Sequence, residues 1–356
     1  MSKQLHMTHV HSDVPAVERF PSTRYQGSKV RHLRWIRSHL EGISFGSALD
    51  AFGGTGAVSY LFKAMGKRTI YNDHLKANFL TGKALVENKD VRLEARRLVE
   101  VFRPLPGRNY DDFIARTFKD IFFTDDENRQ LDVAGRNLQY LGGYEATLAY
   151  HAIFQACIAK RPYNLFHRAN LYMRLADVDR SFGNKATWDK SFEEHSIAAV
   201  NEANAAVFDN GMENVAVCVD ALDAPADVDL VYLDPPYMSD KGVGVDYLDF
   251  YHFIEGLADY DTWPSVVDHK YKHRPLRRRE TPWCDKERIS QQFDRVLDRF
   301  KDSIIVLSYR SDGIPSVSEL IKLVKRHKRR VREPVFANQK YVLSNKQSME
   351  LLLVAE

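Results

Sequence analysis

The sequence has few of the residues that build disulfide frameworks, zinc knuckles or membrane spans. Only 3 of its 356 residues are cysteine, and Cys157, Cys218 and Cys284 form no C-x-x-C pair. This pattern argues against a disulfide scaffold and against a cysteine-based metal site. No apolar run approaches the roughly 20 residues that span a bilayer, and the polar residues 1–13 contain no signal-peptide core. We therefore expect a cytoplasmic protein with no membrane segment and no metal.

The composition is that of a globular protein. Charged residues make up 28% and hydrophobic residues 44% of the chain, which excludes collagen-like, coiled-coil and disordered classes. A chain of 356 residues forms one large or two modest domains and can bury a sufficient core without disulfides.

The net charge of only +3 conceals a segregated distribution of basic residues. The first basic segment, residues 270–279, holds six Lys/Arg and no acid, and the second basic segment, residues 322–332, holds seven and no acid. Such local potential favours a polyanion whatever the net charge, although each segment alone is equally consistent with a solvated surface.

Predicted strands and helices alternate at both ends of the chain. After a helix at 29–40, the strands are expected at 47–52, 68–72, 215–219, 229–233 and 303–309, with helices at 58–66 and 317–327. Segments 341–343 and 350–354 predict an antiparallel hairpin at the sheet edge. Residues 76–207 are helical by periodicity, which indicates an inserted helical unit.

The turn at 50–56, Asp-Ala-Phe-Gly-Gly-Thr-Gly, follows the first predicted strand, where an open parallel sheet places its ligand. Gly53, Gly54 and Gly56 allow a ligand to approach the backbone. The third position of a dinucleotide fingerprint is Ser59 in place of Gly or Ala. Asp73 ends the second strand, where a carboxylate can accept both ribose hydroxyls of an adenosine ligand or cap the next helix.

The sequence Asp234-Pro235-Pro236-Tyr237 directly follows an apolar strand. The two prolines fix the backbone and remove two N–H donors, so nearby carbonyls are free to face a ligand. An Asp carboxylate beside such a carbonyl makes a pair of acceptors suited to an exocyclic amino group. Tyr237 adds a ring on which a planar base can stack.

With these motifs in this order, the sequence resembles the Dam-like, D12-class DNA adenine N6-methyltransferases over residues 20–356. Residues 24–29, Arg-Tyr-Gln-Gly-Ser-Lys, are similar to the family's N-terminal motif, in which the aromatic residue and the lysine contact S-adenosylmethionine. Tyr25 stands where the family often has Trp. The resemblance implies a cofactor site made of Tyr25, Lys29, Asp50, Phe52, Gly53, Gly54, Gly56, Asp73, Asp220 and Asp234, of which Asp220 meets the cofactor adenine.

The resemblance also implies a fold and a division of the chain. We predict an α/β, Rossmann-like S-adenosylmethionine-dependent methyltransferase fold with an inserted, mainly helical recognition domain. The expected parts are an N-terminal arm at 1–20, a catalytic domain at 21–75 and 208–356, and a target-recognition insertion at 76–207.

The expected reaction is methyl transfer to adenine N6 in duplex DNA. A flipped adenine would give its amino group to Asp234 and the Pro235 carbonyl, with Tyr237 on its ring and no covalent enzyme intermediate. Cations, an amide and an aromatic ring within 160–168 suit phosphate, base-edge or wedge contacts. The predicted DNA-binding residues are Lys160, Arg161, Tyr163, Asn164, Arg168, Lys270, Lys272, Arg274, Arg277, Arg278 and Arg279.

Two other functions remain open at this point. N4-cytosine methylation uses the same architecture, but those enzymes usually carry Ser where this chain has Asp234. A non-catalytic DNA-binding partner subunit would be expected to have lost Asp234 or Lys29. Cytosine C5 methylation is excluded because no Pro-Cys nucleophile follows the glycine turn, although 213–215 reads Glu-Asn-Val. We expect a prokaryotic monomer, with a cognate restriction endonuclease as a further partner.

Overall fold

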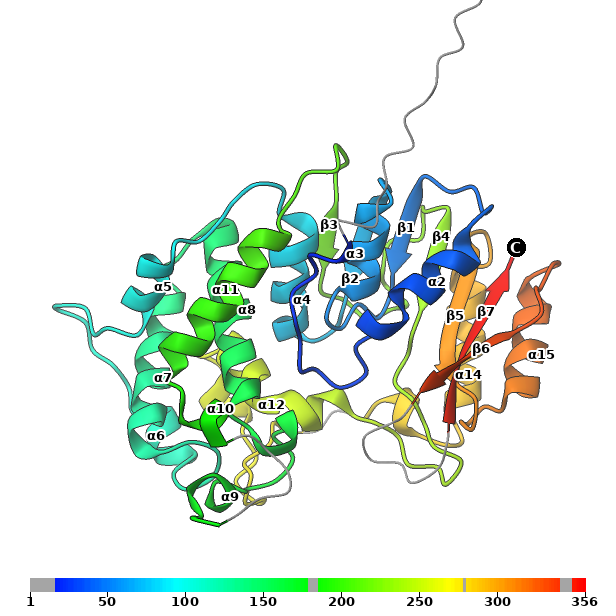
Figure 1. Cartoon of the computed structure of the whole chain (residues 1–356). Coiled ribbons are helices and arrows are strands. Elements are labelled where there is room, and N and C mark those ends of the chain that lie inside the picture. Colours follow the sequence, from blue (N-terminus) through cyan, green and yellow to red (C-terminus); the bar gives the residue numbers. More distant parts are fainter. Residues whose placement is uncertain (1–16, 179–184, 278–279, 340–347) are drawn as a thin grey trace, which may run out of the picture.

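The computed structural model describes residues 17–178, 185–277, 280–339 and 348–356. Within these ranges seven strands form one sheet in the order β3-β2-β1-β4-β5-β7-β6 (Figure 1). The strands are β1 (Ser47–Asp50), β2 (Arg68–Asn72), β3 (Val215–Val217), β4 (Leu230–Leu233), β5 (Ile304–Arg310), β6 (Val335–Gln339) and β7 (Ser348–Ala355). Strands β1 to β5 pair in parallel, whereas β7 runs antiparallel to both β5 and β6.

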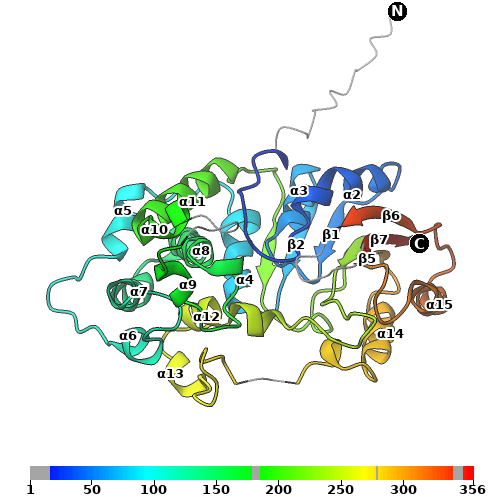
Figure 2. The ribbon, with the colours of Figure 1, turned by 60° about the horizontal axis from the view of Figure 1, so that its bottom comes forward.

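Helices cover both faces of the sheet, as Figure 2 shows, because its central strands are apolar on both sides. On one face lie the 3-10 helix η1 (Val30–His32), α2 (Leu33–Leu40) and α3 (Ala57–Ala64). The apolar residues of α2 and α3 pack against Leu230, Tyr232 and Val306. On the other face lie α14 (Ile289–Arg299) and α15 (Val317–His327), packed against Val231, Leu233 and Leu307.

A helical lobe lies beside the β3 end of the sheet (Figure 1). Its helices include α8 (Gly143–Ala159) and α11 (Phe192–Ala206), which lie side by side. The others are α4 (Lys76–Gly82), the π-helix η2 (Lys83–Glu87), α5 (Ala95–Val101), α6 (Phe113–Thr117), α7 (Asp125–Leu138), the 3-10 helix η3 (Pro162–Asn164), α9 (Tyr172–Leu175) and α10 (Lys185–Asp189). The described part of 76–207 contains helices and no strand.

A later segment of the chain shares the core of this lobe. It contains α12 (Tyr247–Ala258) and α13 (Trp263–Val266), followed by the 3-10 helix η4 (Pro282–Cys284). Phe253 and Trp263 are buried against Phe118 and Phe122 of the helical lobe. Because α12 comes soon after β4, it connects the helical lobe directly to the loop that carries Asp234.

Most predicted elements agree with the structure to within a few residues. An antiparallel pair at the sheet edge is present, formed by β6 (Val335–Gln339) and β7. The strand expected at 341–343 lies outside the described part of the chain. Residues 1–16 of the expected arm lie outside it too. No helix in the described ranges is long and apolar enough to cross a membrane.

Candidate active site

The crevice at the carboxyl ends of the strands holds two adjoining pockets. Strand β1 has β2 on one side and β4 on the other, so the chain direction of the connections reverses here. The first pocket reaches Tyr25, Lys29, Asp50 and Asp234, and the second reaches Asp220 and Trp283. The two pockets share the residues Phe52, Asp73, His74, Pro236 and Tyr247.

The glycine turn at 53–56 forms one wall of the first pocket. The ring of Tyr71, on β2, lies so close to Gly53 that an added Cβ atom would be 2.2 Å from it. Gly54 and Gly56 have φ values of +52° and +79°, which L side chains rarely adopt. The Tyr71 hydroxyl donates to the Gly54 carbonyl at 2.8 Å. These contacts explain why glycine is required in the turn.

Asp50 ends β1 with one carboxylate oxygen satisfied and one without a partner. Its Oδ2 accepts hydrogen bonds from the Ser59 amide at 3.2 Å and the Ser59 hydroxyl at 2.7 Å. Its Oδ1 is buried with no hydrogen-bond partner among the described residues, and Asp50 lines the first pocket. Burial raises the pKa of Asp50 to about 7, although the Ser59 hydrogen bonds oppose the shift. Its Oδ1 is therefore an acceptor on the pocket wall that no described residue uses.

Asp73 and Asp220 follow β2 and β3. Asp73 Oδ2 accepts from the Gly54 amide at 2.9 Å and from Asn78 Nδ2 at 3.1 Å, and its Oδ1 accepts from the Leu75 amide at 2.9 Å. A carboxylate oxygen can accept two hydrogen bonds, so Oδ1 keeps room for a ligand. Asp220 is exposed on the second pocket, where its Oδ1 accepts from the Leu222 amide at 2.9 Å.

Asp234 takes part in a buried polar cluster at the end of β4. Its Oδ2 accepts from Lys29 Nζ at 2.6 Å, and its Oδ1 accepts from the Tyr237 hydroxyl at 2.7 Å. Burial raises the pKa of Asp234, and the nearby carboxylate of Glu350 acts in the same direction while Lys29 opposes it. Burial lowers the pKa of Lys29, but Asp234 and Glu350 together raise it above its usual value. Lys29 is therefore a cation at neutral pH.

Three tyrosines lie against one another at the edge of the first pocket. The Tyr25 ring stacks on Tyr251 with centroids 4.1 Å apart and on Tyr247 with centroids 5.7 Å apart. The Tyr25 hydroxyl accepts a hydrogen bond from Asn78 Nδ2 at 3.0 Å. Because Tyr247 and Tyr251 belong to α12, this stack joins the N-terminal motif to the helical lobe.

Comparison with known proteins gives the same assignment as these motifs. A family model described as the D12 class N6 adenine-specific DNA methyltransferase matches residues 25–263. The chain belongs to this family. It is therefore an adenine-specific DNA methyltransferase, and its sheet and helices are those of the S-adenosylmethionine-dependent methyltransferase fold.

Curated relatives match the methyltransferase along most of its length. Type II methyltransferase M2.HphI of Haemophilus parahaemolyticus is 28% identical over 326 residues, covering 88% of this chain and 90% of that protein. Type II methyltransferase M.NlaIII of Neisseria lactamica is 23% identical, covering 85% of this chain and 87% of that protein. Type II methyltransferase M.FokI of Planomicrobium okeanokoites is 22% identical, and the match covers 47% of that longer protein.

The structure places Tyr237 of the methyltransferase differently from the predicted stacking position. Its ring is buried, edge-on to Tyr309 with centroids 5.0 Å apart, and it lines neither pocket. Its hydroxyl lies within hydrogen-bonding distance of both Asp234 Oδ1 and Glu350 Oε1, and its single proton is donated to one of them at a time. Pro235 is also buried, whereas Pro236 lines both pockets. In this structure Tyr237 therefore contacts the carboxylates of Asp234 and Glu350 and does not face the pocket.

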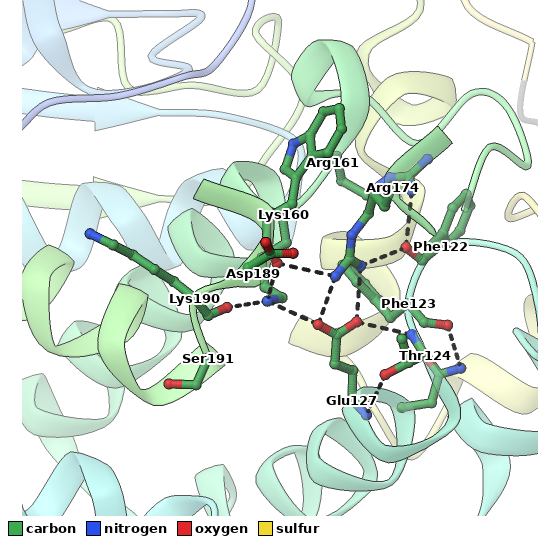
Figure 3. A network of polar contacts seen from close by, with 12 residues as sticks. Phe122, Phe123, Thr124, Glu127, Lys160, Arg161, Arg174, Asp189, Lys190 and Ser191 are labelled. Atoms are coloured by element: carbon green, nitrogen blue, oxygen red, sulfur yellow. Dashed lines mark hydrogen bonds and ion pairs between the residues drawn. The ribbon is translucent and has the colours of Figure 1, made fainter. Parts of the chain in front are cut away.

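Two predicted DNA-binding residues, Lys160 and Arg161, are buried in a polar network of the helical lobe (Figure 3). Lys160 Nζ lies 2.9 Å from Glu127 Oε1 and donates to the Trp188 carbonyl at 2.8 Å. Glu127 also receives Arg174, and these two cations hold its pKa below the usual range although burial opposes them. Lys160 thus has an internal partner, which corrects the expected DNA contact.

Arg161 shapes the surface loop that follows it. Its guanidinium donates to the carbonyls of Leu165 at 3.2 Å, Phe122 at 3.2 Å and Arg168 at 3.1 Å, and also to Asn170. Its donors are directed at protein acceptors because the residue is buried, so it supports the loop and does not reach DNA. This corrects the second expected contact.

The loop held by Arg161 exposes Tyr163 and Arg168 and leaves Asn164 half-buried. Tyr163 is 54% exposed, and Tyr163 and Asn164 have φ values of +60° and +59°, a conformation that is uncommon outside glycine. Arg168 is exposed too. The Phe166 amide donates to the Phe250 carbonyl at 2.9 Å, which ties the loop to α12.

The two basic segments differ in how their charges are used. In the first, Lys270, Lys272 and Arg277 are exposed, and Arg274 is half-buried with its guanidinium on the His269 carbonyl. None of these four forms an ion pair with a described residue, while Arg278 and Arg279 lie outside the described ranges. In the second, Lys328 is buried on backbone carbonyls, and Arg330 and Arg332 pair with Glu356. The first segment therefore keeps more charge available for a polyanion.

The sequence alone did not identify Glu350, Tyr247, Tyr251, Asn78 or Trp283. A signal for Glu350 was present, because it is the one carboxylate in the otherwise apolar run at 349–355. The tyrosines of α12 carried no motif that would distinguish them from core residues. No cluster of metal-ligating side chains occurs among the described residues.

Proposed function

We propose that this methyltransferase transfers a methyl group from S-adenosylmethionine to N6 of adenine at a defined site in duplex DNA. The observation that carries the proposal is that one pocket is lined both by Asp50, whose Oδ1 has no hydrogen-bond partner, and by Asp234 of the buried polar cluster. The first supplies an anion for a cationic cofactor, and the second supplies an acceptor for an amino group.

The residues of the two pockets fit S-adenosylmethionine. Asp50 Oδ1, buried without a partner, would receive the ammonium group of the methionine part. Asp73 would accept one ribose hydroxyl with the capacity left on Oδ1, and Asp220 would accept from the adenine amino group in the second pocket. Phe52 and Pro236, which line both pockets, would pack against the adenosine. Once bound, this cofactor provides an electrophilic methyl group.

The remaining chemistry depends on positioning. The target adenine would leave the duplex and place its amino group at Asp234, which accepts a hydrogen bond and keeps the nitrogen lone pair directed at the methyl group. The nitrogen then attacks in line, and no covalent bond to the protein forms. The retained Asp234 and Lys29 argue against a non-catalytic partner subunit. Asp in place of Ser, together with the adenine-specific family, argues against N4-cytosine methylation.

The DNA surface is proposed to combine the loop at 162–168 with the first basic segment. Tyr163 is an exposed ring on a rigid, strained loop, suited to insertion beside a base pair, and Asn164 and Arg168 lie beside it in the chain. The first basic segment would contact phosphates.

Because the relatives are named type II methyltransferases, we propose that the enzyme acts as a monomer beside a cognate restriction endonuclease.

Charge reversal in the first basic segment should weaken DNA binding without regard to sequence. The triple variant Lys270→Glu, Lys272→Glu, Arg277→Glu should flatten the slope of log affinity against log salt by about 0.9 for each phosphate that the variant no longer neutralises. The matched control reverses Lys322, Lys325 and Arg329, three exposed cations of the second basic segment. Equal weakening in both triples would contradict the assignment of the first segment.

The substrate class is tested with methyl-labelled S-adenosylmethionine and four acceptors: duplex DNA, denatured DNA, RNA and total protein. Label should enter duplex DNA in preference to the other three. Preferential labelling of RNA or protein would contradict the proposed function.

A further inference from the structure

Glu350 is a buried carboxylate to which the reaction described above assigns no role. It lies on β7 with 1% exposure, directly before the apolar and buried residues 351–355 of the strand. The Tyr237 hydroxyl oxygen lies 2.5 Å from its Oε1, the Ser308 hydroxyl donates to the same oxygen, and Lys29 Nζ lies 3.6 Å away. Burying a carboxylate is costly unless it is paired, so its position next to Lys29 needs an explanation.

Both oxygens of Asp234 already accept a hydrogen bond in this structure. Lys29 occupies Oδ2 and Tyr237 occupies Oδ1. The bond from Lys29 joins two charged groups and is therefore stronger than any bond from a neutral amino group. An adenine amino group must compete with Lys29 unless the ammonium has another acceptor nearby.

Glu350 is an acceptor for the same two donors. Lys29 Nζ is 2.6 Å from Asp234 and 3.6 Å from Glu350, so a small movement of a flexible side chain exchanges one carboxylate for the other. The Tyr237 hydroxyl already lies within hydrogen-bonding distance of both. The ammonium of Lys29 also lies over the ring of Tyr237, 5.0 Å from its centroid.

We propose that Glu350 is a positioning residue that takes over Lys29 and Tyr237 when the target amino group binds Asp234. The inference rests on the proposed function, because it assigns how that same site accepts its base. Asp234 alternates between a resting state paired with Lys29 and a state free to hold adenine N6. Glu350 provides the second partner that makes the exchange possible without an unpaired buried ammonium.

The charges of Lys29, Asp234 and Glu350 agree with an exchange of Lys29 between the two carboxylates. One ammonium faces two carboxylates in the cluster. During transfer the N6 lone pair forms the new N–C bond, the electron pair of the broken C–S bond stays on sulfur, and N6 is cationic until it loses a proton. With Lys29 on Glu350, Asp234 is a free carboxylate beside that nitrogen, and it accepts the proton.

The test replaces Glu350 with Gln, which keeps the shape and an acceptor for Ser308 and Tyr237 but removes the charge that holds Lys29. We expect kcat to fall by at least about 30-fold, as for the removal of one charge-assisted interaction in the reacting state. The KM values for DNA and for S-adenosylmethionine should change by less than about threefold. The control is Glu333→Gln at an exposed position, which should retain kcat. A wild-type kcat in Glu350→Gln would overturn the proposal.

A second variant separates the positioning role from general damage. Lys29→Met is measured alone and with Glu350→Gln, at saturating cofactor. If Glu350 acts through Lys29, the double variant should be no slower than the slower single variant. Decreases in kcat that multiply would mean that the two residues act independently, which would contradict the proposal.

The unfolding of these proteins tests the pairing without any substrate. Lys29→Met removes the cation from a cluster of two carboxylates in the wild type but from a single carboxylate in the Glu350→Gln background, so it should lower the urea midpoint less in that background. Equal shifts would overturn the proposed exchange. A wild-type protein that labels no DNA would contradict the proposed function instead, and the urea midpoints would still report whether Lys29 and Glu350 are paired.

Discussion

Asp234→Ala should lower kcat for methyl transfer by about 10³-fold, within the range expected when a positioned acid–base group is removed. Without the carboxylate, the target amino group has no acceptor to orient its lone pair. The protein should still fold, because Lys29 retains Glu350 as a partner 3.6 Å away. Single-turnover transfer from labelled S-adenosylmethionine to DNA measures the effect.

The control for this variant is Asp227→Ala, an exposed carboxylate shortly before β4. It should transfer at the wild-type rate. Cofactor affinity should remain within a few-fold in both proteins, since Asp50, Asp73 and Asp220 are unchanged. Retained transfer in Asp234→Ala would show that another residue accepts the amino group.

Asp50→Asn should make the protein more stable and the cofactor site weaker. The pKa of Asp50 is raised from 3.8 to about 7 by burial, so the folded protein binds its proton more tightly than the unfolded chain. That contribution to stability is complete below pH ~4 and is lost as the pH rises to ~7. A shift of about 3 units corresponds to an upper bound of ~4 kcal/mol at pH 8, part of which the amide should recover.

The pH dependence is what distinguishes this result. The free energy of unfolding of Asp50→Asn should exceed that of the wild type at pH 8, and the difference should shrink as the pH falls toward 4. Urea titrations at several pH values measure it, with the exposed Asp90→Asn as the control. A variant that is less stable than the wild type at pH 8 would mean that the charge on Asp50 is stabilised in the folded protein, which would contradict the prediction.

Asp50→Asn should weaken the binding of S-adenosylmethionine even though it stabilises the fold. An amide cannot replace a carboxylate opposite a cationic ammonium, and the removal of one such hydrogen bond should raise the Kd for S-adenosylmethionine by about 10- to 100-fold. Calorimetric titration measures this Kd. Unchanged binding would contradict the role given to Asp50.

The parts of the fold that follow local rules could be predicted from the sequence. Asp50, Asp73, Asp220 and Asp234 each follow an apolar segment, and parallel strands bring such ends to one edge of a sheet. The helix at Val317–His327 begins with Ser316 and Glu319, which form a capping box in the structure. These signals lie within a few residues of one another, so no long-range information is needed to read them.

Features that depend on distant residues could not be read in this way. Lys160 and Arg161 suggested a DNA contact by composition, but Glu127, Phe122 and Asn170 surround them in the folded chain. Glu350 lies 116 positions after Asp234, and they come together because β5 pairs with β4 on one side and with β7 on the other. A periodic pattern indicates that a residue is buried, but it does not identify the residue's partners.

The position of the Tyr237 ring also depends on residues that are distant in the sequence. Its place after two prolines suggested a ring in the pocket, and the ring is instead packed against Tyr309 with its hydroxyl on the acidic cluster. Tyr25 and Tyr247, from the N-terminal motif and α12, line the first pocket.

The central claim is that the methyl group reaches N6 of adenine. The most direct test is to label duplex DNA with methyl-labelled S-adenosylmethionine, digest it to nucleosides and identify the labelled one by chromatography against standards. The structure predicts that the label co-migrates with N6-methyldeoxyadenosine and that its rate of incorporation falls by about 10³-fold when Asp234→Ala replaces the wild type. Label in N4-methyldeoxycytidine or 5-methyldeoxycytidine would contradict it.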